Sequence, residues 1–353
     1  EYDGGGIYAA SDTDFMMLTL CNFTDNFASS GAGMFVSEIN DDILLTSCTF
    51  ETNTASIIGA GIFVSSSNDR MLLSDCVFRG NEAPYAGGLF ASTENIDLTL
   101  VNCEFDGNSA RMDGGGLYVG ARNDVLSVSG CTFINNGATK GGGMFVNTDN
   151  RGLSISTSIF MNNSATDGGG LFVANENTAI LISSTNFSDN IVDSNGAGFH
   201  LRSNNHDVSL ETCSFARNRA AFGAGVFLDS DNDLLDLTSC TFENNAVVGY
   251  GGALYVGSGN DNVALTSCTL SDNIAHDYGG AVYVGCGNLN MLVTSTSFMR
   301  NYAGTDGGAV SLMFDNFHTL VVDSLFHSNI AGLEGACVSV MFCCSPALLA
   351  VVF

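Results

Sequence analysis

Residues 240–257 read CTFENNAVVGYGGALYVG, and this stretch contains both landmarks that decide the fold. One is an FxxN motif, Phe242 to Asn245, and the other is a glycine-rich triplet that ends at Ala253. Both recur along the chain at steps of 27 or 28 residues. The triplets end at Gly6, Gly33, Gly61, Gly88, Gly116, Gly143, Gly170, Gly198, Gly225, Ala253, Ala281, Ala309 and Cys337. The motif asparagines are Asn26, Asn53, Asn81, Asn108, Asn136, Asn163, Asn190, Asn218, Asn245, Asn273, Asn301 and Asn329. This period is typical of a solenoid, here with about twelve repeats.

Inside each repeat the hydrophobic period is two, which indicates strands with one buried face. Leu117 and Val119 are apolar on either side of Tyr118, and Cys131 and Phe133 alternate with Thr132. Glycine and asparagine stand where the chain must turn. We therefore expect an all-β fold, a right-handed parallel β-helix with three short strands per coil. Residues 1–353 should form a single continuous β-helix domain, a rod of roughly 58 Å at ~4.8 Å per coil.

The composition narrows the range of partners. The chain has 353 residues, with 10 Lys and Arg against 37 Asp and Glu, and a net charge of -27. Nucleic acid is an unexpected partner because phosphate binding requires clustered basic residues. No stretch approaches the ~20 apolar residues of a spanning helix, so we expect no membrane insertion.

A family resemblance follows from the repeat motifs. The tetrapeptides Gly251 to Leu254, Gly279 to Val282 and Gly307 to Val310, combined with FxxN motifs such as Phe298 to Asn301, resemble the paired GGA[ILV] and FxxN repeats of the chlamydial polymorphic outer-membrane proteins. The resemblance implies a surface-displayed β-helix passenger with an adhesive role. Together with the composition, it leads us to expect an extracellular or cell-surface protein.

Stacked coils place equivalent residues above one another, so each column becomes a ladder. The asparagine columns are best interpreted as structural, with amides that bind the backbone and the next asparagine. Eight of the 12 cysteines share one slot with Ser158, Thr185, Thr296 and Ser324, which favours buried thiols over a disulfide framework, although oxidation of some neighbouring pairs stays an alternative. Cys343 and Cys344 lie outside this column and are candidates for a cross-link at a junction between subunits.

An aromatic ladder lies between the inward aliphatic positions of the first strand. We expect it to face outwards and contact a partner, either another rod or sugar rings, although crowding or a loop could cover it. Its members are Tyr8, Phe35, Phe63, Phe90, Tyr118, Phe145, Phe172, Phe227, Tyr255 and Tyr283.

Two further groups are candidate sites for ions or glycans. Calcium could bind between coils at an aspartate column, for which the alternative is a solvated acidic face. This column includes Asp41, Asp69, Asp124, Asp233 and Asp261. The sequons at Asn22, Asn162 and Asn186 are candidate N-glycosylation sites.

These observations favour an extracellular structural protein that stacks head-to-tail into filaments or a matrix. The ends of the sequence are apolar, so we expect a homo-oligomer formed by end-to-end contacts. The alternative is a surface adhesin passenger that binds a host or glycan ligand. A polysaccharide-active β-helix enzyme comes third, because no catalytic arrangement stands out and Lys140 is the only lysine. We expect no catalytic activity and no cofactor other than the candidate calcium.

Overall fold

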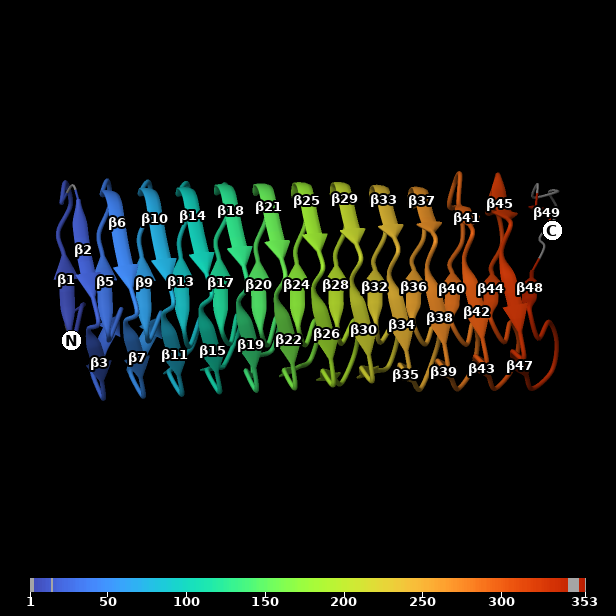
Figure 1. Cartoon of the computed structure of the whole chain (residues 1–353), viewed down its shortest axis with the longest axis horizontal. Helices are drawn as coiled ribbons and strands as arrows, with labels where there is room; N and C mark the ends of the chain where they lie inside the picture. The colour runs from blue at the N-terminus through green and yellow to red at the C-terminus, as the bar shows by residue number, and fades with distance from the viewer. Residues whose placement is uncertain (1–2, 14, 342–348, 353) are drawn as a thin grey trace. The chain divides into compact units, whose positions relative to one another are not determined.

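The computed structural model describes residues 3–13, 15–341 and 349–352, and all of its regular elements are β-strands. Its contacts divide the chain into two compact units, Glu1–Thr178 and Ala179–Phe353. Each unit is a stack of similar coils (Figure 1). The expectation of a single continuous domain stays a prediction.

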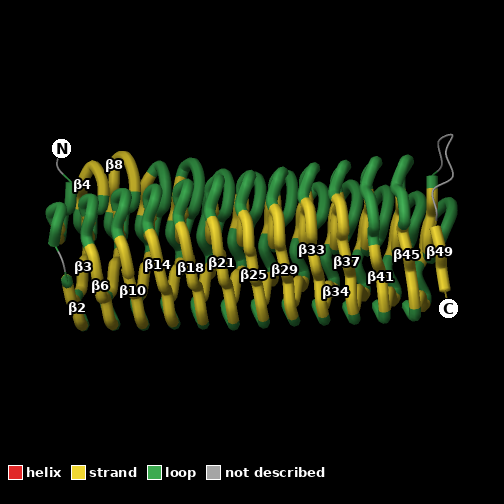
Figure 2. The backbone as a smooth tube through the Cα atoms, turned by 90° about the horizontal axis from the view of Figure 1, so that it is seen from above, coloured by secondary structure: helices red, strands yellow, loops and turns green. Residues whose placement is uncertain are grey.

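One coil consists of three short strands joined by tight turns, followed by a longer connection (Figure 2). In the middle of the first unit these strands are β17 (Leu117–Val119), β18 (Asp124–Ser129) and β19 (Thr132–Ile134). Each strand pairs in parallel with its counterpart one coil away, so that Phe133 lies between Phe105 and Phe160. The result is a parallel β-helix with three long sheets, which we name the first, second and third sheet in chain order, and two shorter sheets formed by the short strands of the connections.

The strands of the first unit keep this order in every coil. Its first sheet contains β1 (Ile7–Ala9), β5 (Met34–Val36), β9 (Ile62–Val64), β13 (Leu89–Ala91), β17, β20 (Met144–Val146) and β24 (Leu171–Val173). The second contains β2 (Met16–Thr19), β6 (Asp41–Thr46), β10 (Asp69–Ser74), β14 (Ile96–Val101), β18 and β21 (Arg151–Ser156). The third contains β3 (Asn22–Thr24), β7 (Thr49–Glu51), β11 (Val77–Arg79), β15 (Glu104–Asp106), β19 and β22 (Ile159–Met161). The remaining strands are β4 (Phe27–Ser30), β8 (Thr54–Ile58), β12 (Glu82–Ala83), β16 (Ser109–Ala110) and β23 (Ser164–Ala165).

The second unit repeats the arrangement. Its first sheet contains β28 (Phe199–Leu201), β32 (Val226–Leu228), β36 (Leu254–Val256), β40 (Val282–Val284), β44 (Val310–Leu312) and β48 (Val338–Val340). The second contains β25 (Thr178–Ser183), which begins on the last residue of the first unit, β29 (His206–Glu211), β33 (Asp233–Thr238), β37 (Asp261–Thr266), β41 (Leu292–Thr294), β45 (Thr319–Val322) and β49 (Leu349–Val352). The third contains β26 (Asn186–Ser188), β30 (Ser214–Ala216), β34 (Thr241–Glu243), β38 (Thr269–Ser271), β42 (Ser297–Met299) and β46 (Leu325–His327). The short strands are β27 (Ile191–Val192), β31 (Arg219–Ala220), β35 (Ala246–Val247), β39 (Ile274–Ala275), β43 (Tyr302–Ala303) and β47 (Ile330–Ala331).

Single residues in the left-handed conformation form the corners between sheets. Asn102 (φ 52°) turns the chain from β14 to β15, and Asn135 (φ 58°) follows β19. Asparagine and aspartate tolerate this conformation better than other residues with a side chain, because their short polar groups can hydrogen-bond locally. The equivalent corner carries Leu20, Ser47 and Thr157 in other coils, so the coil geometry also imposes this conformation on residues that favour it less.

The predicted inward and outward positions are confirmed for the FxxN motif. Phe133 is fully buried, and its ring stacks on those of Phe105 and Phe160 with centroids 4.7 and 4.6 Å away. The structural role of the motif asparagines is also confirmed. Asn136 donates its Nδ2 hydrogens to the Phe105 carbonyl oxygen (2.9 Å) and to Asn163 Oδ1 (3.1 Å), so each coil is tied to both neighbours.

The cysteine column lies in the same core. The ten cysteines in the described ranges are free thiols, and seven of the eight in the column are buried. The Cys103 thiol donates to the carbonyl oxygens of Val101 and Leu73, both 3.5 Å away. A small buried side chain with one donor fits this slot, which explains why Ser158 can replace cysteine there and donate to Ser156 O at 2.8 Å.

Candidate functional site

The aromatic ladder is largely buried, so the prediction of an exposed strip is wrong. Tyr8 is 54% exposed, and Phe35, Phe90 and Tyr255 are half-buried. The other members are buried, namely Phe63, Tyr118, Phe145, Phe172, Phe227 and Tyr283. The rings do lie on the opposite strand face from the aliphatic core, since their neighbours Met34 and Val36 are fully buried inside the coil.

Two physical causes remove the rings from solvent. First, adjacent rings stack, with centroids 4.5 Å apart for Phe90 and Tyr118 and 4.9 Å for Tyr118 and Phe145. Second, the connection before the strand folds back over them. Gly114 has a φ of +71°, and a Cβ there would be 2.8 Å from the Cβ of Tyr118, so only glycine lets the backbone approach this closely.

Side chains from the connections complete the cover. Tyr85 packs edge-on against Tyr118 with centroids 6.2 Å apart, and Tyr250 stacks on Tyr283 at 4.9 Å. The Lys140 ammonium lies 5.7 Å from the centroid of the Phe172 ring. Burial raises the pKa of Tyr118 to about 12, although its hydroxyl accepts a hydrogen bond from Asn147. The aromatic ladder thus forms a second buried layer, on the outer face of the first sheet and beneath the connections.

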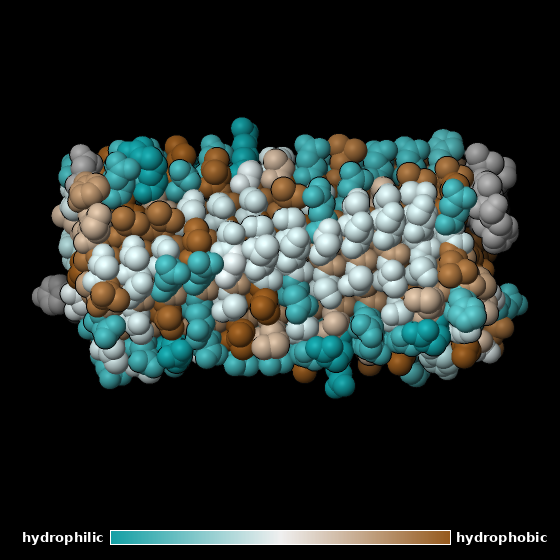
Figure 3. Space-filling view, viewed as in Figure 1, coloured by the Kyte–Doolittle hydropathy of each residue, from teal (hydrophilic) through white to brown (hydrophobic). Residues whose placement is uncertain are grey.

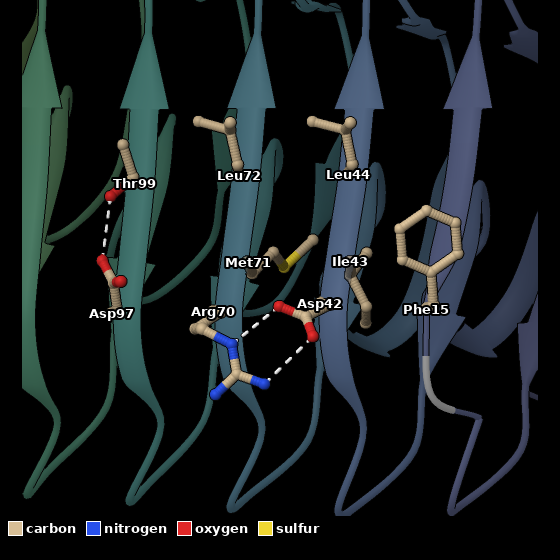
Figure 4. A pocket seen from close by; sticks show the side chains of 9 residues that line it. All are labelled: Phe15, Asp42, Ile43, Leu44, Arg70, Met71, Leu72, Asp97 and Thr99. Atoms are coloured by element: carbon tan, nitrogen blue, oxygen red, sulfur yellow. Dashed lines mark hydrogen bonds and ion pairs between the residues drawn. The ribbon is translucent and has the colours of Figure 1, made fainter.

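A concave exposed surface of the first unit lies elsewhere, on the outer face of its second sheet. A groove of about 570 Å³ crosses β6, β10 and β14 and extends to Phe15 (Figure 4). Two rows of outward side chains border it. One row contains Leu44, Leu72 and Thr99, which are paired in register between successive coils. We call this row the apolar rim.

The opposite row is ionic and is called the ionic rim. It contains Asp42, Arg70 and Asp97, which share a left-handed backbone with φ of 57°, 55° and 57°. This local bend turns three successive coils in the same way and brings the side chains to the edge of the groove (Figure 4). Phe15, with a φ of 60° and 67% exposure, occupies the equivalent position one coil earlier.

An ion pair between Arg70 and Asp42 holds the charged side chains of this rim together. The Arg70 guanidinium donates to both Asp42 oxygens, at 2.6 and 3.0 Å, and reaches Asp41 at 3.4 Å. The hydrogen bond from Arg70 holds the pKa of Asp42 below its ordinary value. Asp97 accepts a hydrogen bond from the Thr99 hydroxyl at 3.1 Å. The lowered pKa of Asp42 favours its charged form, which suits binding rather than proton transfer.

The second unit has a smaller groove at the same place in its coils. It has a volume of about 370 Å³, and one side of it is a register row of Asp236, Ala264, Leu292 and Leu320. Its other rim is formed by Leu234, Asn262, Asn290 and His318, and Asn290 donates to Asn262 Oδ1 at 3.1 Å. The two grooves therefore share leucines on one side, but the second has a carboxylate, Asp236, in that row and lacks the aspartates and arginine of the ionic rim.

The aspartates proposed for calcium are only partly brought together. Asp41 lies opposite Asp69 in register, and Asp233 lies opposite Asp261, whereas Asp124 lies opposite Arg151. Within residues 3–13 and 15–341, no three His, Cys, Asp or Glu side chains are placed to hold one metal ion. Calcium binding stays a prediction.

The sequons differ in accessibility. Asn22 and Asn162 are exposed, whereas Asn186 is half-buried in β26 and the serine of its sequon, Ser188, is buried. Glycosylation stays a prediction, with Asn22 and Asn162 the more accessible acceptors. Cys343 and Cys344, the proposed junction cross-link, lie outside the described residues.

The groove was missed by the sequence analysis, although a signal exists. In several coils the strands of the second sheet alternate apolar and polar residues, as at 98–100, but residues 43–45 and 71–73 are continuously apolar, as are 16–18, 180–182, 263–265 and 291–293. Leu44 and Leu72 therefore break the alternation at outward positions, beside charged residues two positions earlier. Exposed apolar side chains are frequent in the first coils and include Met17, Leu20 and Phe27. In Figure 3 hydrophobic surface, coloured brown, gathers near the N-terminal end of the chain.

Comparison with protein families agrees with the geometry. The model of the right-handed β-helix region matches residues 2–160 and 97–215, which together span more than half of the chain, so the chain belongs to this family. The predicted all-β, right-handed parallel β-helix of about twelve coils is thereby confirmed.

A second family model refines the class. The repeat of the Chlamydia polymorphic membrane proteins matches residues 239–257, which contain an FxxN motif and a Gly-Gly-Ala triplet. The predicted resemblance to that repeat type is confirmed, and it indicates a surface, passenger-type β-helix. A comparison with curated proteins gave no significant match. In the part of the chain that the structure describes, no helix is long and apolar enough to cross a membrane.

Proposed function

We propose that this chain is a non-catalytic, surface-displayed β-helix that acts as an adhesin-type passenger, with the groove of the first unit as its binding site. The observation that carries the proposal is the groove itself, in which an apolar rim and an ionic rim face each other across about 570 Å³. This volume lies in the range of ordinary ligand pockets.

The scaffold suits such a role. Each rim residue stands on a strand whose neighbours repeat the same backbone, and buried phenylalanine and asparagine ladders hold the coils in register. Little conformational entropy is therefore lost when a ligand is bound. Arg70 lowers the pKa of Asp42, the opposite of the shift that a general acid requires.

Bead retention tests the adhesive function. Beads coated with the chain are passed over cell monolayers and extracellular-matrix proteins, and the retained fraction is measured. The variant Leu44→Ser/Leu72→Ser removes the apolar rim, and Leu292→Ser/Leu320→Ser makes the same change at the equivalent positions of the second unit. We expect retention of unmodified and control chains and loss for the first variant. Absence of retention on every surface contradicts the function.

A filament-forming structural role is the second proposal. It is supported by the regular stacking of the coils. The hydrogen bond from Asn108 Nδ2 to Asn136 Oδ1 is 3.0 Å long, and the one from Asn136 Nδ2 to Asn163 Oδ1 is 3.1 Å long. A coil of another copy could continue such a ladder. The aromatic ladder no longer supports lateral association, because most of its rings are buried. Long filaments in negative-stain micrographs of native material support this role, and separate particles contradict it.

A further inference from the structure

We propose that the groove of the first unit binds a protein segment that carries basic side chains on one side and apolar side chains on the other. The inference rests on the proposed adhesive function and names the chemistry of the partner.

Charge complementarity selects the basic side of the partner. Arg70 is the only cation on the ionic rim, and its guanidinium is already engaged by Asp42 and Asp41. Asp97 is the second carboxylate of the rim, and Asp41 and Asp69 stand beside it on the strands that carry Asp42 and Arg70. Four carboxylates against one guanidinium leave an excess of negative charge. A basic side chain is attracted there, and the net charge of -27 adds longer-range attraction.

The opposite rim selects the apolar side of the partner. Leu72 is 36% exposed and Leu44 is half-buried, and Phe15, in line with the ionic rim at the end of the groove, is 67% exposed. An apolar side chain placed between these three would shield them from water. A second copy of this chain is a poor occupant, because it carries the same net charge of -27. A neutral glycan would leave the excess carboxylates without a cation.

The size of the groove limits the partner to a short segment. About 570 Å³ accommodates a few side chains rather than a folded domain, so a single contact should be weak. Display of many copies on one surface raises the strength of attachment through avidity without any additional contact. Weak individual sites are therefore compatible with an adhesive function.

The test uses the intact chain and three synthetic octapeptides as probes. One alternates lysine and leucine, the second alternates lysine and serine, and the third alternates glutamate and leucine. Binding is measured by fluorescence anisotropy at low and at physiological salt. We expect the lysine–leucine peptide to bind at least about tenfold more tightly than either of the others. Because exposed charges are screened, its affinity should fall as salt is added.

Variants assign the binding to the groove. Leu44→Ser/Leu72→Ser should weaken lysine–leucine binding at least about tenfold, and Leu292→Ser/Leu320→Ser should leave it unchanged. Asp69→Asn/Asp97→Asn should reduce the salt dependence, and asparagine suits the left-handed backbone at residue 97. Far-ultraviolet circular dichroism and the urea midpoint verify that each variant is folded.

Several outcomes overturn the inference. They are equal binding of the glutamate–leucine peptide, equal loss in the two leucine variants, or displacement of the peptide by a neutral oligosaccharide. If beads coated with the chain are retained while the lysine–leucine peptide fails to bind, the adhesive function stands and the partner chemistry is wrong. If the peptide binds at the groove and no surface retains the beads, the function is wrong and the peptide site remains.

Discussion

Replacement of Phe133 by alanine should destabilise the central coils of the first unit far more than replacement of its neighbour Thr132. Phe133 has no solvent exposure and stacks between Phe105 and Phe160. Thr132 precedes it in β19 and points to the outside, where it is half-buried. The two substituted residues are adjacent in sequence, but their side chains lie on opposite faces of the third sheet.

The expected magnitude follows from the burial. An aromatic side chain buries on the order of 200 Å², which at about 25 cal/mol per Å² corresponds to about 5 kcal/mol. Alanine retains the Cβ contacts, while the cavity left between two rings adds a cost, so the loss should be about 3–5 kcal/mol. Thr132→Ala removes only partly exposed atoms and should cost less than about 0.5 kcal/mol.

Urea unfolding followed by circular dichroism measures the difference, and native-state hydrogen exchange shows where it acts. Exchange is needed because a solenoid can open coil by coil, so one global free energy does not describe it. Protection should fall in β15, β19 and β22 for Phe133→Ala. Equal shifts of the urea midpoint for the two variants would refute the inward and outward assignment.

Three further predictions concern the ladders. Asn136→Ala leaves the Phe105 carbonyl and the Asn108 amide without their partner, and should lower the free energy of unfolding by about 2–4 kcal/mol. The exposed control Asn135→Gly keeps the left-handed turn and should cost much less; similar urea midpoints would show that the amide ladder is dispensable. Hydrogen bonding with Cys131, together with burial, raises the pKa of Cys103 to about 12, so an alkylating reagent at pH 8 should modify exposed Cys286 and Cys337 and spare Cys103 until the chain unfolds. Mass spectrometry would contradict this by finding rapid modification of Cys103 or disulfides within the column. Burial raises the Tyr118 pKa from about 10 to about 12, so the neutral phenol stabilises the fold below pH 10 and this contribution is lost between pH 10 and 12. Tyr118→Phe should flatten the fall of the urea midpoint over that range, and an unchanged slope would argue against a buried phenol.

The fold could be predicted because every repeat supplies the same information. Phe133 and Asn136 occupy slots that recur along the chain at a fixed separation, so register and alternation together assign the buried face. Stacking then determines their partners, since an equivalent residue lies one coil away on each side.

The exposure of the aromatic ladder could not be predicted by the same reasoning. Alternation shows that Tyr118 lies on the outer face of its strand, but it does not show what covers that face. The cover depends on the close approach of Gly114 and on Tyr85, a residue in the connection of the preceding coil. Such connections vary between repeats, so the ladder pattern alone could not predict them.

The groove depends on a backbone bend that residue type does not reveal, because the same left-handed position is occupied in other coils by Val125, Ala179 and Asp207. Asp42, Arg70 and Asp97 reach its edge because each adopts a left-handed conformation inside a strand. The sequence signal was limited to Leu44 and Leu72, two apolar residues at outward positions. Leu44 and Leu72 can be recognised as one side of a groove only in the structure, where adjacent coils place them in one row opposite the ionic rim.

Photo-cross-linking during adhesion tests the central claim most directly, namely that the groove of the first unit is the surface that binds a partner. A photoreactive phenylalanine is placed at Leu72 in one chain and at Leu320 in another, each chain is attached to a retaining surface, and cross-linked partner is quantified by mass spectrometry. We expect cross-links from position 72, to segments with basic and apolar residues, and none from position 320. Equal cross-linking from both positions, or none from position 72 while adhesion persists, would contradict it.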